Sequence, residues 1–375
     1  MKIGIICHPS IGGSGLVATQ LGIGLAKKNH EIHFVSRAMP FKLSGSEKNI
    51  YFHPVEPISY PLFDDNLYTF ALTAKIVEVV EQYQLDIVHA HYSIPHSLCT
   101  YLASQISSRN FKTITTIHGT DTTLVGRDKP LFPLNRFSIE KSDVVTTVSE
   151  YQKQHTLDQF QLHKPIEVIY NFIDPHVFKP QRASAEVRQS LAADDEKLIM
   201  HISNFRQPKN TFGVVKSFAK TVGKINARLV LIGNGPNMAE TKILCLNLGI
   251  IDKVTFLGKR NHLENIIPNA DCVLQPSYID SFGMVSLEAM ASGVPAVTSN
   301  RDGIPEVVSH GVTGYIADPD DHDALAAYLI DICNDSELQK KIGENGRARA
   351  MDYFLWDNQV EKYLNCYENS LNNTM

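Results

Sequence analysis

The sequence predicts two α/β domains, each built on a doubly wound parallel sheet. The chain has 375 residues, whereas one domain usually holds roughly 100 to 200, so two domains of similar size are expected. Apolar runs of four to seven residues alternate with stretches of helical period along the chain, which is the pattern of β-α-β units. In each half a glycine-containing turn leads from a strand into a helix, at 8–15 and at 233–236.

The first half contains enough elements for one complete doubly wound domain. Strands are expected where short apolar runs lie between polar or glycine residues, and helices where apolar residues recur every three or four positions. The expected strands are 2–7, 31–36, 87–90, 113–117 and 144–148. The expected helices are 15–28, 67–83, 95–107 and 132–141.

The second half repeats this pattern after a boundary near residue 170. The polar stretch 181–197 separates the two halves further. Its expected strands are 198–203, 228–232, 254–257, 272–275 and 296–299, with helices between them. A helix over 323–332 and two further helical stretches follow, the last over about 352–371. We therefore expect an N-terminal domain over 1–168 and a C-terminal domain over 169–351. The terminal segment, 352–375, is expected to be a helix for which docking back on the N-terminal domain is one possibility.

Composition and charge exclude several functional classes. The net charge is −5 with a pI near 6.3, and no run of Lys or Arg forms the basic surface that nucleic-acid binding needs. Apolar stretches are only as long as strands, and the chain starts with a strand where a signal peptide would need an apolar segment. We expect a cytoplasmic protein with no integral membrane segment and no nucleic-acid partner. The sequence leaves the oligomeric state open, homo-oligomers included.

Neither cysteines nor histidines predict a metal site. The six cysteines lie far apart without a C-x-x-C pair, so buried free thiols are expected. His89 and His91, with His96 beyond, could share one face of a strand and gather a metal. No Cys or carboxylate partner follows at ligand spacing, so we expect no metal and no cofactor.

The N-terminal glycine turn has three possible meanings. At a helix N-terminus, backbone N–H groups and the helix dipole favour an anion. Gly13, Gly15 and Ala18 also satisfy the dinucleotide fingerprint G-x-G-x-x-G/A, so an NADP-dependent oxidoreductase is an alternative. The second strand ends in Ser36-Arg37, which suits a 2′-phosphate and lacks the acidic residue that binds NAD. A purely structural turn remains the third possibility.

Four segments of the second half are each expected to end at the carboxyl edge of its sheet, where ligands bind in open α/β folds. Together they offer two cations, two glycine turns and acidic residues placed to bind a nucleotide diphosphate and a ribose. These segments are Ser203 to Lys209 with Asn204 and Arg206, Gly233 to Pro236 with Gly235, Asp280 to Glu288, and Asp302 to Glu306.

The third segment carries a family resemblance. Asp280-x7-Glu288, within Ser-Phe-Gly-x-Val-x-Leu-Glu-Ala-Met-Ala-x-Gly-x-Pro, resembles the E-x7-E motif of the retaining family 4 glycosyltransferases of the GT-B type. The resemblance covers essentially the whole chain. It implies two Rossmann-like domains with the active site in the cleft between them. One departure is Asp280, because the family usually has the longer Glu there.

Further motifs resemble the family members that open bacillithiol biosynthesis. These motifs are Gly12 to Gly22, His89 to His96, Thr116 to Asp121, Tyr170 to Asp174 and His201 to Arg206. The resemblance implies UDP-GlcNAc as the donor and L-malate as the acceptor. The alternatives are a family 4 enzyme with another sugar nucleotide or acceptor, and a non-catalytic sugar-nucleotide binding protein in which Asp280 marks lost activity.

The resemblance and the residue chemistry together predict the site residues. A leaving diphosphate needs fixed cations, helix N-termini or a metal, and this sequence favours the first two. The D-x-D-like run 318–323 is expected to be a helix cap and not a metal site. Expected catalytic residues are His118, Arg206, Lys209 and Asp280. Expected donor-binding residues are Gly13, Asn204, Gly233, Gly235, Ser281, Phe282, Gly283, Met284, Val285 and Glu288. Expected acceptor-binding residues are Gly13, Ser14, Tyr92, Thr120, Asn171 and Arg206.

Overall fold

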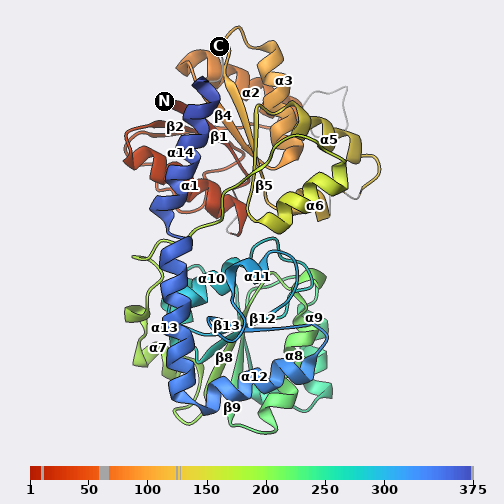
Figure 1. Cartoon of the computed structure of the whole chain (residues 1–375), viewed down its shortest axis with the longest axis vertical. Coiled ribbons are helices and arrows are strands. Elements are labelled where there is room, and N and C mark those ends of the chain that lie inside the picture. The colour runs from red at the N-terminus through yellow and green to blue at the C-terminus, as the bar shows by residue number, and fades with distance from the viewer. Residues whose placement is uncertain (10–11, 59–66, 124–125, 127, 373–375) are drawn as a thin grey trace. The chain divides into compact units, whose positions relative to one another are not determined.

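The chain forms two compact units, each with its own parallel sheet (Figure 1). The computed structural model describes residues 1–9, 12–58, 67–123, 126 and 128–372. Unit 1 comprises Met1–Asn171 together with Trp356–Met375, and unit 2 comprises Phe172–Leu355. All the strand pairings that form the two sheets are parallel, which confirms the predicted α/β class with two doubly wound sheets.

Unit 1 contains a seven-stranded sheet in the order β3-β2-β1-β4-β5-β6-β7. Its strands are β1 (Lys2–Ile6), β2 (Glu31–Ser36), β3 (Ile50–Pro54), β4 (Ile87–His91), β5 (Lys112–Ile117), β6 (Val144–Thr147) and β7 (Glu167–Val168). Its α-helices are α1 (Ser14–Lys27), α2 (Tyr68–Tyr83), α3 (Leu98–Ile106), α4 (Thr120–Thr123), α5 (Phe132–Lys141), α6 (Glu150–Phe160) and α14 (Trp356–Asn372), and a π-helical turn spans Ser93–Ser97. Every residue of β4 is buried, as a strand covered on both faces requires.

Unit 2 contains a six-stranded sheet in the order β10-β9-β8-β11-β12-β13. Its strands are β8 (Lys197–Ile202), β9 (Ala227–Ile232), β10 (Val254–Gly258), β11 (Cys272–Gln275), β12 (Ala296–Ser299) and β13 (Gly314–Ala317). Its α-helices are α7 (Ala185–Leu191), α8 (Thr211–Val222), α9 (Met238–Asn247), α10 (Met284–Ala291), α11 (Ile304–Val307), α12 (His322–Asn334) and α13 (Ser336–Tyr353).

Both sheets reverse their strand order at one point, and that point positions the candidate site. In unit 1 the reversal lies between β1 and β4, and in unit 2 between β8 and β11. At such a switch point the connections leave toward opposite faces, so a crevice opens beyond the carboxyl ends of the two strands. The site is therefore sought in the loops that follow these strands.

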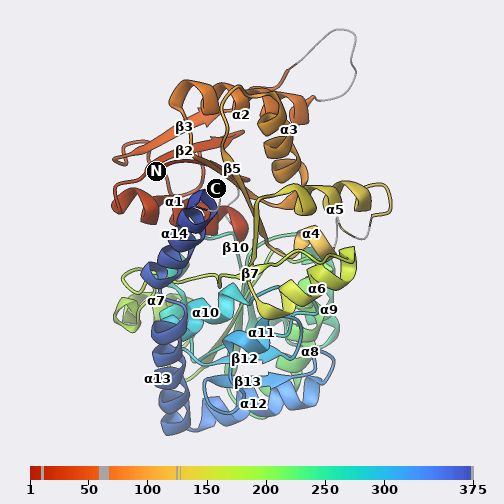
Figure 2. The ribbon, with the colours of Figure 1, turned by 45° about the horizontal axis from the view of Figure 1, so that its top comes forward.

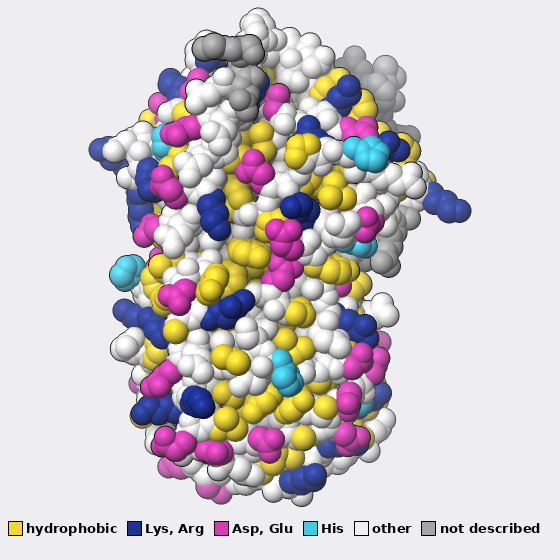
Figure 3. All heavy atoms as spheres, in the orientation of Figure 1, with side chains coloured by type: hydrophobic (Ala, Val, Ile, Leu, Met, Phe, Trp, Pro, Cys, Tyr) yellow, Lys and Arg dark blue, Asp and Glu magenta, His cyan; other side chains and the backbone are white. Residues whose placement is uncertain are grey.

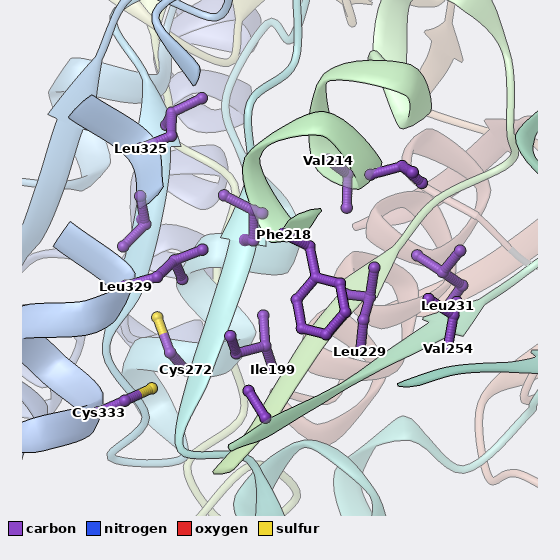
Figure 4. Packing of buried hydrophobic residues seen from close by; sticks show 14 of the residues in the cluster. Ile199, Val214, Phe218, Leu229, Leu231, Val254, Cys272, Leu325, Leu329 and Cys333 are labelled. Atoms are coloured by element: carbon purple, nitrogen blue, oxygen red, sulfur yellow. The ribbon is translucent and has the colours of Figure 1, made fainter. Parts of the chain in front are cut away.

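The core of unit 2 joins its sheet to α8 and α12. Val214 and Phe218 of α8 and Leu325 and Leu329 of α12 are fully buried, and Figure 4 shows them around the strand residues, among them Leu229 of β9. A fully buried Phe or Leu side chain contributes about 1.5 to 3 kcal/mol by leaving water. This packing holds the sheet edge in place beneath the loops.

The C-terminal helix returns to unit 1, where it packs against α1 (Figures 1 and 2). The Trp356 indole N–H donates to the Gln20 carbonyl at 3.0 Å, and Lys28 pairs with Glu361 at 2.7 Å. Tyr363 and Tyr367 of α14 are fully buried. A Cβ at Gly24 of α1 would lie 2.7 Å from Val360, so glycine permits this close approach.

The structure differs from the sequence prediction in several elements. It adds the strands β3, β7 and β13 and the helices α4, α6 and α7, which were not expected. The helix expected over 352–371 is wrong at its start, because α13 continues to Tyr353 and α14 begins at Trp356. Phe354 and Leu355 break the helical path, and the Phe354 carbonyl accepts a hydrogen bond from Ile173 at 2.9 Å. The break therefore coincides with the return of the chain from unit 2 to unit 1.

The surface has no concentrated charge on the face shown in Figure 3, where Lys and Arg side chains are interspersed with Asp and Glu. Among the described residues, no helix is both long and apolar enough to cross a membrane.

Candidate active site

In unit 1, the loops after β1, β4 and β5 bring Ser14, Tyr92 and His118 together. The Ser14 hydroxyl donates to the Tyr92 phenol oxygen at 2.8 Å. The rings of Tyr92 and His118 lie 5.4 Å apart. Thr120 also hydrogen-bonds Tyr92, whose pKa is raised by burial and by the nearby Asp121 carboxylate. Four predicted residues from three separate motifs therefore form one cluster.

Gly13 begins helix α1 in a backbone conformation that favours glycine. Its φ is 49° and its ψ is −114°, and its carbonyl accepts the first hydrogen bond of the helix, from Val17 at 3.1 Å. The N–H groups of the first turn of a helix have no acceptor within the helix, so they are available to an anion. Residues 10 and 11 of the same predicted turn lie outside the described residues.

His118 is buried and uncharged at neutral pH. Only 8% of its surface is exposed, and its Nε2 lies 2.8 Å from Nδ1 of His91. Burial, with a smaller contribution from His96, lowers the pKa of His118 to about 3. The side chain can therefore offer a hydrogen bond, but it carries no positive charge for a leaving group.

Asp121 was not among the predicted site residues, although it holds the His118 loop. Its carboxylate accepts the backbone N–H of His118 at 3.0 Å and the backbone N–H of Ser93 at 2.7 Å. Burial raises the pKa of Asp121 to about 6 despite these hydrogen bonds. The sequence signal for this residue is its position three residues after His118, the spacing at which an acidic side chain in a first helical turn bonds back to a preceding backbone N–H.

Asn171, the remaining acceptor residue predicted in unit 1, lies at the end of the first segment of that unit. It is 6% exposed, and its Oδ1 has no hydrogen-bond partner among the described residues.

In unit 2, two glycines allow the loops after β8 and β9 to meet. A Cβ at Gly233 would lie 1.8 Å from the Ser203 carbonyl oxygen, and one at Gly235 would lie 1.8 Å from that of Asn204. Gly233 also has a φ of +123°, which other residues rarely adopt. These glycines therefore set the path of the loop that carries Arg206.

The two predicted cations differ in their surroundings. Arg206 is exposed, whereas Lys209 forms an ion pair with Asp280 at 2.6 Å. Burial alone would raise the pKa of Asp280, but the Lys209 ammonium and the N–H groups of Gly283 and Phe282 outweigh it and hold the pKa below its usual value. Asp280 is therefore a carboxylate at neutral pH.

Asp280 also shapes the turn before α10. Its Oδ1 accepts the N–H of Gly283 at 2.9 Å and that of Phe282 at 3.3 Å, while its own N–H donates to Asp302 at 2.9 Å. Gly283, with a φ of 94°, then begins the helix. Within α10, Glu288 is buried with 6% of its surface exposed. Ser281, Met284 and Val285 are partly exposed around this turn.

No metal-binding arrangement was found among the described residues, for which no group of three His, Cys, Asp or Glu side chains could hold an ion. His89 and His91 instead bond to other side chains, His89 to Tyr367 and Thr116, both at 2.7 Å, and His91 to His118. The acidic run 318–323 caps α12, because the Asp321 side chain accepts the N–H of Ala324 at 2.9 Å.

Comparison with known sequences finds glycosyltransferases over nearly the whole chain. Residues 11–177 match the family described as Glycosyltransferase Family 4, and residues 183–349 match that described as Glycosyl transferases group 1. The chain is 42% identical over 367 residues to the N-acetyl-alpha-D-glucosaminyl L-malate synthase of Bacillus anthracis, covering 98% of this chain and 96% of that protein. It is 25% identical to the D-inositol 3-phosphate glycosyltransferase of Mycolicibacterium smegmatis, covering 96% of this chain and 87% of that protein.

Solved structures of glycosyltransferases share the fold. Anabaena Alr3699/HepE in complex with UDP-glucose matches with a TM-score of 0.84 and 21% identity, over 98% of this chain and 100% of that chain. A glycosyltransferase from Rickettsia africae matches with a TM-score of 0.83 and 21% identity, over 100% of this chain and 99% of that chain.

Proposed function

The chain belongs to the family 4 glycosyltransferases, and we propose that it transfers N-acetylglucosamine from UDP-GlcNAc to the hydroxyl of L-malate with retention of anomeric configuration. The observation that carries this proposal is the 42% identity to an N-acetyl-alpha-D-glucosaminyl L-malate synthase over 98% of the chain. The product would enter bacillithiol biosynthesis, as the motif resemblance implies. Membership of the family removes the NADP-dependent oxidoreductase as an alternative.

Unit 2 supplies the donor half of this proposal. We assign the ribose hydroxyls to Glu288 and the diphosphate to Arg206, Lys209 and the first turn of α10. Since the N–H of Gly283 already donates to Asp280, the N–H groups of Met284 and Val285 are the better candidates for phosphate oxygens. Gly283 then acts through its backbone conformation. Asn204, Gly233 and Gly235 shape the neighbouring loop, and Ser281 and Phe282 complete the turn.

Unit 1 supplies the acceptor half. A dicarboxylate needs hydrogen-bond donors, and charge-assisted bonds of this kind are roughly twice as strong as neutral ones. The first turn of α1 after Gly13, the linked hydroxyls of Ser14 and Tyr92, and Thr120 are such donors. Asn171 and Arg206 are further candidates, Arg206 serving both the acceptor and the leaving group.

Fixed charges support a mechanism without a metal. The developing negative charge of the UDP leaving group would meet Arg206, Lys209 and the helix N-terminus, of which Lys209 is held in place by Asp280 at 2.6 Å. In a front-face reaction a leaving phosphate oxygen takes the proton of the malate hydroxyl, so no carboxylate base is needed. Neutral His118 is assigned to a hydroxyl of the sugar near the reacting carbon.

The proposal predicts UDP release that depends on both substrates. Purified protein is incubated with UDP-GlcNAc, with and without L-malate, and UDP is measured; UDP-glucose, GDP-mannose and inositol phosphate serve as competing donors and acceptor. Release only with UDP-GlcNAc and L-malate supports the proposal. UDP or GDP release with another donor and acceptor would show a family 4 glycosyltransferase with other substrates. UDP-GlcNAc binding without turnover would instead indicate a binding protein.

The six cysteines fit a reducing compartment, because all are buried as free thiols. We infer that the enzyme acts in the cytoplasm.

A further inference from the structure

A buried hydrogen bond between the imidazoles of His91 and His118 determines which nitrogen of His118 carries the proton. Nδ1 of His91 and Nε2 of His118 lie 2.8 Å apart, and burial lowers the pKa of both side chains, so both are neutral. One nitrogen of the pair must therefore carry the proton and the other must accept it. The two arrangements differ in which nitrogen of His118 is protonated, and hence in what His118 offers a substrate.

The surroundings of His91 distinguish the two arrangements. His91 is fully buried, and its Nε2 has no hydrogen-bond partner among the described residues. If His118 donated to His91, the proton of His91 would sit on this Nε2 as a buried donor without an acceptor. Buried N–H groups without a partner are rarer than acceptors with unused lone pairs. The arrangement in which His91 donates from Nδ1 avoids that cost, since it leaves only a lone pair on Nε2.

The position of the His91 ring is held from several sides. Its ring stacks on His89 at 4.4 Å and on His118 at 5.1 Å. His89 is itself anchored through both nitrogens, by Tyr367 and Thr116. The His91 carbonyl accepts the Nδ1–H of His96 at 2.5 Å, which fixes the backbone at the end of β4. These contacts at the carboxyl end of β4 therefore hold Nδ1 of His91 in position to donate to His118.

We propose that His91 is a positioning residue that donates Nδ1–H to Nε2 of His118 and so holds His118 in the Nδ1–H tautomer. The Nδ1 edge of His118 is then a hydrogen-bond donor, suited to a hydroxyl or phosphate oxygen and unable to act as a base. Only the identity of that oxygen rests on the proposed glycosyltransfer. The tautomer itself is a property of the protein without substrate.

The tautomer is measured by NMR on protein labelled with ¹⁵N-histidine at neutral pH, with the His118 signals assigned by their loss in His118→Gln. The expected result is a protonated Nδ1 and a bare Nε2 on His118. A protonated Nε2 in the wild-type protein overturns the proposal, whatever the substrates prove to be. This readout is independent of turnover, so it can fail separately from the proposed function.

Two matched variants test the consequence for activity. His91→Phe keeps the ring and removes the donor, whereas in His91→Asn an amide nitrogen takes the place of Nδ1. We expect kcat to fall about 10-fold to 100-fold in the Phe variant, in line with loss of a positioned hydrogen bond. In the Asn variant we expect most of that loss to be recovered. In both variants KM for UDP-GlcNAc stays within about twofold. Equal losses in both variants, with the His118 tautomer unchanged in His91→Phe, would contradict the proposal.

Discussion

At the scale of single residues, Asp280 has both structural and electrostatic roles. One carboxylate oxygen accepts two N–H groups of the turn before α10, and the other pairs with Lys209 at 2.6 Å. A Glu side chain is one methylene longer and would place its oxygens differently relative to these groups. Asp280 replaces the usual Glu of the family motif at a compact turn, where its shorter side chain bonds two backbone N–H groups and the Lys209 ammonium.

Arg206→Ala and Lys209→Ala test the proposed stabilisation of the leaving group. Each change removes a positive charge that matters most as the bond to UDP breaks, so kcat is expected to fall by about 100-fold or more. The control is Lys220→Ala, because Lys220 forms an exposed pair with Asp323 in the same unit and lies outside the site. Steady-state UDP release measures all three variants. A near-normal kcat in Arg206→Ala would remove that role.

Gly233→Ala tests the close approach of two loops. The new Cβ would meet the Ser203 carbonyl at 1.8 Å, at a φ of +123°. We expect a loss of about 1 to 3 kcal/mol in stability from strain, together with weaker UDP-GlcNAc binding as the Arg206 loop shifts. Gly223→Ala is the matched control, since its nearest neighbour is 3.9 Å away. Calorimetry measures both effects. Equal melting temperatures in the two variants would argue against the strain.

The residues of the site differ in how far sequence could predict them. Glycine turns, cations and acids at strand ends are local patterns, and their chemistry follows from residue type. Asp121 and His91 were missed because their roles depend on pairing with His118, which for His91 spans 27 residues. Spacing alone does not show which nitrogens of two histidines meet.

At the scale of elements, α14 completes the core of unit 1 through Tyr367. The Tyr367 hydroxyl bonds Nδ1 of His89 at 2.7 Å inside the protein. Tyr367→Phe leaves that nitrogen unpaired, which costs about 1 to 3 kcal/mol. We expect a lower melting temperature with unchanged UDP affinity, because unit 2 is proposed to bind the nucleotide.

The control for this variant is Tyr51→Phe, since Tyr51 is 47% exposed on β3. Thermal unfolding and UDP titration are measured on both proteins. A stability of Tyr367→Phe equal to that of Tyr51→Phe would show that the buried bond contributes nothing.

The elements that sequence predicted are those with clear hydrophobic patterns. Strands such as β2 and β11 have the predicted bounds, because their apolar residues face a buried core. The helix α5 also has the predicted bounds, although only one of its buried residues, Ile139, is apolar. The strand β3 was missed since it lies at the sheet edge, where three of its five residues are partly buried, two are exposed and none is fully buried. The break between α13 and α14 depends on the return of the chain to unit 1, which local propensity does not encode.

At the scale of the whole molecule, buried neutral histidines predict loss of stability in acid. Burial lowers the pKa of His89 and His96 to about 3, and that of His201 to about 4. Since an unfolded His titrates near pH 6.5, the unfolded chain binds more protons below that pH, and stability falls as pH decreases. The raised pKa of Asp121 opposes this trend, because its buried charge is neutralised as pH falls through about 6.

These histidines outnumber the one carboxyl with a raised pKa, so their effect on stability is expected to be the larger. The melting temperature should therefore fall as pH decreases from about 6.5 to about 4. Each histidine lowers the free energy of unfolding by at most about 1.4 kcal/mol per pH unit. Calorimetry over this range measures the slope. In His201→Gln, whose amide can bond the Leu274 carbonyl as His201 does, the slope should be smaller. A melting temperature that is constant or rises as pH falls would contradict the account.

The central claim is that this chain is a retaining transferase that joins N-acetylglucosamine to L-malate using fixed charges. The most direct test is the ¹H NMR spectrum of the product formed from UDP-GlcNAc and L-malate in the presence of a metal chelator. The account predicts one product, N-acetylglucosaminyl malate with the α configuration of the donor, formed at the same rate with and without the chelator. A β-configured product, or no product with L-malate, would contradict it.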